Sequence, residues 1–101
     1  MVVTVFRSRL RPEHAEEFQQ LADRMLTLAR GMPGFISYDT YLSEDGERAS
    51  IVAFESAEHL RGWREHPEHA EAIRVGRERY YSRYDLLVAD PLRESHFEHK
   101  P

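Results

Sequence analysis

The chain contains no cysteine, which excludes disulfide bonds, thiolate nucleophiles and metal sites with cysteine ligands. Lysine is almost absent too, because Lys100 is the only one, so positive charge comes from arginine. The arginines are interspersed with acidic residues and form no basic block, and the net charge is −4 at pH 7. This charge pattern argues against a nucleic-acid partner.

Long hydrophobic runs are also absent. The longest run after the first strand-like segment, "LLVA" at Leu86–Ala89, has the size of a strand and is far shorter than the roughly 20 residues that cross a bilayer. The first residues, "MVVTVFRSRL", lack the basic-then-apolar order of a signal peptide. We therefore expect a cytoplasmic protein with no membrane association. The length of 101 residues favours a single domain.

Hydrophobic periodicity predicts six elements. Residues 2–10 are β-branched and nearly alternating, as in a strand, and the following segment carries an apolar stripe at helical spacing. Pro12 is typical of a first helical turn, Gly31 of the position after the last, and Asp45-Gly46 of a hairpin. The predicted strands are 2–10, 35–42, 48–55 and 79–89, with one helix over 12–30 and a broken helix over 57–63 and 67–76.

The order β-α-β-β-α-β predicts an α+β fold of the ferredoxin-like type, with an antiparallel sheet and the helices on one face. We expect this domain to span residues 1–90, followed by an irregular tail over 91–101. The strands at 2–10 and 48–55 are apolar on both faces, and the helices cover only one. Since monomers rarely expose a large apolar patch, we predict a homodimer joined sheet to sheet.

The segment "GWREHPEHAEAIRVGRERYY" at 62–81 holds the candidate site. His69 falls on the helix side that faces the sheet, beside Ala72 and Ile73. It is either a core histidine with one hydrogen bond or a pocket histidine placed for proton transfer. Trp63 is either a packing anchor or a pocket wall. Two His-x-x-His spacings occur, but neither has a third ligand, so we predict no metal site.

Four stretches together resemble one family. They are "FRSRLRPEHAEEF", "MPGFISYDTYLSEDG", "VAFESAEHLRGWREHPEHAEAIRVGRERYY" and "YDLLVAD". In this order they are similar to the antibiotic biosynthesis monooxygenases, small dimeric α/β-barrel proteins that include haem-degrading members. The resemblance implies a pocket between helices and sheet in each subunit, and oxidation of aromatic substrates by O₂ with neither flavin nor metal.

The haem-degrading members use an asparagine, a tryptophan and a histidine. Trp63 matches the tryptophan, but Phe6 and Ile73 stand at the other two positions. We therefore expect no cofactor, and haem is not favoured.

The resulting hypothesis is a homodimeric monooxygenase that binds a small aromatic or phenolic molecule. Phe6, Phe18 and Phe54 would bind the substrate, with His69 and Trp63 as catalytic residues. The alternatives are a non-catalytic ligand-binding or stress-related dimeric barrel with the same pocket, and a haem-binding relative.

Overall fold

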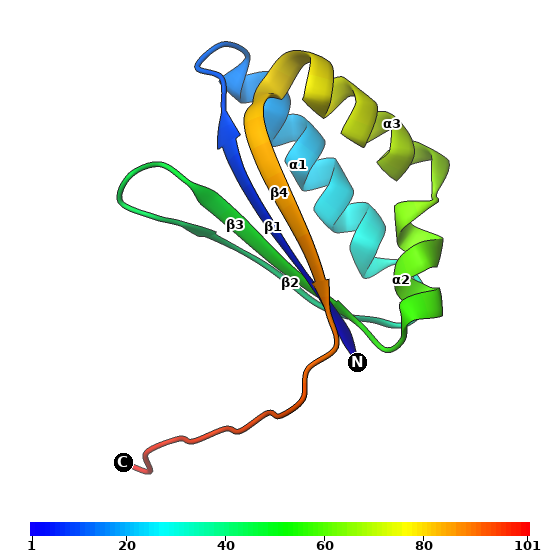
Figure 1. The fold of residues 1–101 in the computed structure, drawn as a ribbon, viewed down its shortest axis with the longest axis vertical. Coiled ribbons are helices and arrows are strands. Elements are labelled where there is room, and N and C mark those ends of the chain that lie inside the picture. Colours follow the sequence, from blue (N-terminus) through cyan, green and yellow to red (C-terminus); the bar gives the residue numbers. More distant parts are fainter.

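The computed structural model describes all residues, Met1–Pro101, and has a helical layer packed on one face of a four-stranded sheet (Figure 1). The elements are β1 (Val2–Leu10), α1 (Ala15–Arg30), β2 (Phe35–Leu42), β3 (Arg48–Phe54), α2 (Ala57–Arg64), α3 (Pro67–Val75), a π-helical turn η1 (Gly76–Tyr80) and β4 (Tyr81–Ala89). The strand order is β2-β3-β1-β4, with every neighbouring pair antiparallel. The predicted ferredoxin-like fold is confirmed.

Alternation along the central strand β1 gives the sheet two different faces. Thr4, Phe6 and Ser8 point toward the helices, where they line a cavity. Val3 and Val5 point the other way, and Val5 lies opposite Ile51 on β3 and Leu87 on β4. No helix covers this outer face (Figure 1), and Leu87 there is 59% exposed. The outer face is apolar, as predicted, but the inner face of β1 carries the polar residues Thr4 and Ser8 beside Phe6, so the prediction of an apolar inner face is only partly right.

The hydrophobic core lies between the sheet and the helices α1 and α2. Its buried cluster comprises Ala29, Val52, Phe54, Leu60 and Trp63. Phe54 is completely buried and stacks on Trp63 with ring centroids 5.6 Å apart. Because α2 contributes both Leu60 and Trp63, this core fixes the position of the segment that leads into α3.

The caps of the short helices follow the sequence. The Ser56 hydroxyl accepts a hydrogen bond from the His59 backbone N–H at 3.1 Å and so caps α2. Pro67 opens α3, and the Nδ1 atom of His66 accepts from the Glu68 N–H at 3.1 Å. His66 therefore serves as a helix cap.

Two element boundaries differ from prediction by two or more residues. Helix α1 begins at Ala15 and not near Pro12, because His14 adopts a left-handed backbone conformation (φ 64°) that a right-handed helix does not continue. Strand β4 begins at Tyr81 and not at Arg79, because α3 runs on into the π-helical turn. Arg79 and Tyr80 are held there by Glu17 of α1, at 2.8 and 3.2 Å.

The segment after Ala89 forms no helix or strand and extends away from the folded part (Figure 1). Each helix of the chain is too short or too polar to cross a lipid bilayer.

Gly34 connects α1 to β2 at a point of close approach. Its φ of 79° lies in the left-handed region, and a Cβ atom there would overlap the ring of His59 on α2. The His59 Nδ1 atom is in turn 2.7 Å from the Ser56 hydroxyl. Glycine at this turn therefore lets α2 pack against the start of β2.

Substituting Gly34→Ala should lower the free energy of unfolding by roughly 2–3 kcal/mol, since backbone strain and the displaced His59 ring both add to the cost. The matched control is Gly62→Ala in α2, where a Cβ atom meets nothing within 4 Å. That change should stabilise the protein by roughly 0.5–1 kcal/mol. Urea denaturation of both variants tests this, and equal effects would refute the role given to Gly34.

Candidate functional site

A cavity of about 490 Å³ lies between the sheet and the helices α1 and α3. This volume is in the range of small-molecule sites. Most of its lining residues are hydrophobic, which suits an apolar or aromatic ligand. Its rim on the edge strand β4 carries Leu86 and Val88, residues that are 52% and 47% exposed.

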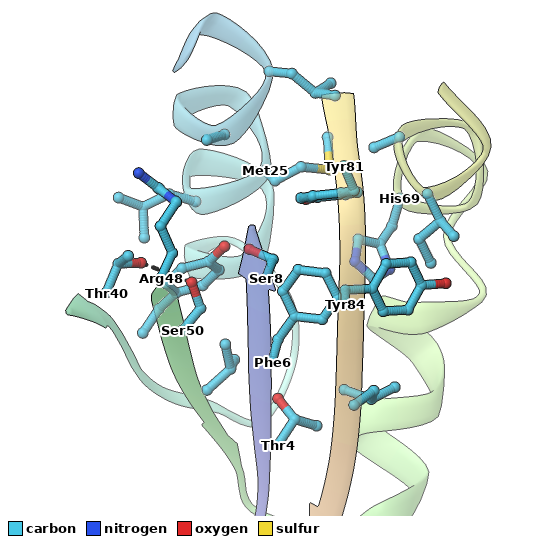
Figure 2. A pocket seen from close by; sticks show the side chains of 18 of the residues that line it. Thr4, Phe6, Ser8, Met25, Thr40, Arg48, Ser50, His69, Tyr81 and Tyr84 are labelled. Atoms are coloured by element: carbon cyan, nitrogen blue, oxygen red, sulfur yellow. Dashed lines mark hydrogen bonds between the residues drawn. The ribbon is translucent and has the colours of Figure 1, made fainter. Parts of the chain in front are cut away.

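Aromatic rings form the centre of the cavity (Figure 2). The Phe6 ring lies 5.0 Å from that of Tyr84 and 5.4 Å from that of Tyr81. Phe18 of α1 meets Tyr81 edge-to-face at 5.8 Å. Burial raises the pKa of Tyr81 to about 12, although the nearby Arg48 guanidinium opposes this shift. The Tyr81 phenol is therefore neutral and acts as a wall of the cavity.

An irregularity in β4 brings both tyrosines to the cavity face. Ser8 pairs with Tyr84, whereas Leu10 pairs with Tyr81, so the register shifts by one residue between Arg9 and Leu10. Residues three apart normally point to opposite faces of a strand, and the bulge puts Tyr81 and Tyr84 on the same face. Gly76 contributes as well, because a Cβ atom there would collide with the Tyr81 ring.

His69 lines the cavity from α3 and stacks on Trp63, with centroids 4.1 Å apart and an interplanar angle of 21°. Its Nδ1 atom is 3.4 Å from the backbone carbonyl oxygen of Arg64. Because a carbonyl only accepts, this contact requires the proton on Nδ1 and leaves the lone pair on Nε2. Burial lowers the pKa of His69, so the ring is neutral at pH 7.

Trp63 belongs both to the core and to the cavity wall. It is 6% exposed and meets Tyr38 edge-to-face at 6.0 Å. Its indole Nε1–H is buried and has no acceptor in the chain. A buried donor without a partner costs free energy, so packing alone does not account for this group.

The structure brings together four of the five predicted site residues: Phe6, Phe18, Trp63 and His69. The expectation that Phe54 lines the cavity is corrected. Its side chain is completely buried in the core against Trp63 and Phe35, because the inner face of β3 at this end is covered by α2.

Sequence reasoning missed Tyr84, Ser8 and Arg48, which also line the cavity. Ser8 and Arg48 had a usable signal, since each shares the strand face of an expected pocket residue. Tyr84 had none, because its orientation depends on the bulge.

Neither His-x-x-His spacing has a third potential ligand grouped with it. His66 caps α3 through Nδ1, and no group of three His, Asp or Glu side chains is close enough to hold a metal ion.

Comparisons with known proteins agree with this fold. A model of the antibiotic biosynthesis monooxygenase family matches residues 1–75. A curated relative, the uncharacterized protein YqjZ of Bacillus subtilis, is 30% identical over 94 residues, which are 93% of this chain and 82% of YqjZ.

Solved structures give the same result. Rv0793 from Mycobacterium tuberculosis superposes with a TM-score of 0.83 at 28% identity, covering 94% of this chain and 98% of that one. SnoaB, a cofactor-independent oxygenase from Streptomyces nogalater, superposes with a TM-score of 0.79 at 15% identity, over 92% and 94% of the two chains. At this identity SnoaB supports the fold alone. With the family model covering three quarters of the sequence, the chain belongs to the antibiotic biosynthesis monooxygenase family.

Proposed function

We propose that this protein is a cofactor-independent monooxygenase that oxidises an aromatic, phenolic small molecule with O₂ inside its cavity. The observation that carries the proposal is the neutral, half-buried His69 on the wall of an aromatic cavity, stacked on Trp63. Membership of the family supports the same reaction class.

His69 has the properties of a general base. With its proton fixed on Nδ1 by the Arg64 carbonyl, the Nε2 lone pair is free to accept a proton from a phenolic hydroxyl. Transfer of this proton produces a phenolate, whose electron density makes the ring a reductant for O₂. Dry aromatic walls then keep water from the reactive intermediate.

The substrate itself supplies all the electrons. In an anthrone-type substrate, a methylene group and O₂ become a carbonyl group and water, so that one oxygen atom enters the product and the other leaves as water. No external reductant is needed. In this proposal Trp63 backs the His69 ring and holds this base beside the reacting carbon.

The alternative is a ligand-binding or stress-related protein with the same cavity and no turnover. Oxygen uptake with a panel of hydroquinones and anthrones separates the two.

The cavity does not fit haem breakdown of the kind that the haem-degrading members perform. The Phe6 side chain has no amide group to donate a hydrogen bond and packs against Tyr81 and Tyr84. The Ile73 side chain has no atom that could ligate iron. No step of the proposed reaction involves haem.

The proposal includes a homodimer joined through the outer face of the sheet. The row Ile51–Val5–Leu87 crosses three strands and is uncovered in the single chain. A second copy of the same face would remove this apolar surface from water.

The pH dependence of stability tests the environment of His69. In the unfolded chain its pKa returns to about 6.5, so below this pH the unfolded state binds more protons than the folded state. The free energy of unfolding should therefore fall as the pH decreases below about 6.5, and less steeply in His69→Gln. His99→Gln in the exposed tail is the control and should keep the wild-type slope. Identical slopes for all three proteins would contradict a neutral, buried His69.

Replacing the proposed base tests catalysis. His69→Ala should lower the rate of O₂ uptake with a phenolic substrate by about 10²–10⁴-fold, because the proton acceptor is lost. The melting temperature should stay nearly unchanged. The control His66→Asn removes a neighbouring imidazole and keeps a helix-capping side chain, so it should retain activity.

If His69 is only a core residue, His69→Ala should instead cost roughly 1–3 kcal/mol of stability with activity per folded molecule intact. That combination would end the catalytic assignment.

Sedimentation tests the dimer. The wild-type protein should sediment as a dimer at micromolar concentration, and Val5→Asp should dissociate or unfold it by burying an unpaired carboxylate. Gln20→Glu on the exposed side of α1 adds the same charge and should leave the dimer intact. A well-behaved wild-type monomer would refute the proposed assembly.

A further inference from the structure

The cavity is more positive than the protein as a whole. The chain carries a net charge of −4, yet the cavity wall holds three arginines, Arg48, Arg64 and Arg77, and a single carboxylate, Asp23. The neutral His69 ring does not change this balance of charge. Such a wall favours an anionic ligand over a neutral or cationic one.

Arg48 is the arginine that projects into the cavity from the sheet. Its guanidinium carbon lies 4.9 Å from the centroid of the Phe18 ring, over which it stacks. It takes part in no ion pair or hydrogen bond within the chain. Arg77 is different, because its Nε donates to the Tyr84 hydroxyl at 2.6 Å. The guanidinium group of Arg48 is therefore free to bind a ligand.

Ser8 provides a second polar group beside Arg48. The two residues are direct cross-strand partners, and Ser8 pairs with Tyr84 on its other side. Ser8 is only 4% exposed and lines the cavity, but its hydroxyl has no hydrogen-bond partner in the chain. The neighbouring hydroxyls of Thr40 and Ser50 are already bonded to each other at 2.8 Å. An unpartnered hydroxyl on the cavity wall next to a free guanidinium is the donor set that a planar oxyanion needs.

We propose that Arg48 and Ser8 form a carboxylate-binding subsite, and that the ligand of this cavity is an aromatic carboxylic acid. The guanidinium binds the two carboxylate oxygens through its planar fork, and the Ser8 hydroxyl donates to one of them. Phe18 and Phe6 contact the attached ring. This inference rests on the proposed function for the reaction, and it adds the class of substrate.

The subsite also sets the orientation of the ligand. Figure 2 shows Arg48 to the left of the Phe6 ring, at β3, and His69 to its right, close to Tyr84. The strand order agrees, since β1 separates β3, which carries Arg48, from β4. A ligand anchored by its carboxylate at Arg48 presents its far end to His69. The substrate is therefore a hydroxylated aromatic acid with its two polar groups at opposite ends.

Calorimetric titration without oxygen tests the subsite apart from any reaction. The matched probes are a naphthalene with a hydroxyl on one ring and a carboxylate on the other, and the corresponding carboxamide. The wild-type protein should bind the acid at least about tenfold more tightly than the amide. Arg48→Gln should remove this preference by weakening the binding of the acid alone. Arg48→Lys should keep part of the preference, because lysine retains the positive charge but lacks the planar guanidinium group.

Ser8→Ala should weaken binding of the acid by a smaller factor. The control Arg61→Gln removes an exposed arginine of α2 that does not line the cavity, and it should leave both affinities unchanged. Thermal melts verify that each variant is folded. Equal wild-type affinities for acid and amide would overturn the subsite, as would an equal loss of both affinities in Arg48→Gln or the same effect in Arg61→Gln.

The two proposals fail separately. Selective binding of the acid with no O₂ uptake from any phenolic acid leaves the subsite standing and removes the monooxygenase. O₂ uptake from neutral phenols, with no preference for binding the acid, leaves the monooxygenase standing and removes the subsite.

Discussion

The stacking of Trp63 is the contact on which both halves of the molecule depend. One residue of α2 packs against Phe54 in the core and against His69 in the cavity. The core thereby fixes the Trp63 ring, which positions His69. This holds although Trp63 lies on α2 and His69 on α3, and a break before Pro67 separates the two helices. A histidine supported in this way has little rotational freedom, and such rigidity is what a proton-transfer group requires.

The fold was accessible from the sequence because its signals are periodic. Alternation in residues 2–10, a helical stripe before Gly31 and the Asp45-Gly46 turn each specify an element without help from the rest of the chain. The inward orientation of His69 followed from the same angular count. Local irregularities were not accessible, because the left-handed His14, the π-helical turn and the bulge opposite Leu10 depend on tertiary contacts.

The residues that line the cavity could likewise be predicted only in part from the sequence. Phe6 and Phe18 could be predicted because an apolar side chain on an inward face has few alternatives. Phe54 has equal hydrophobicity and the same strand face as Arg48, but α2 covers its end of β3. Which part of a sheet face is core and which part is cavity depends on where the helices end. Pattern alone does not carry that information.

The alternation of β1 has a consequence for how the protein can be altered. Even-numbered residues such as Phe6 and Ser8 face the cavity, and odd-numbered residues such as Val5 face away from it. Changes in ligand chemistry and changes in the outer surface therefore draw on different positions of the same nine-residue strand. Selection or engineering can vary what the cavity accepts while leaving the opposite surface as it is. An insertion of one residue, in contrast, would exchange the two sets at once.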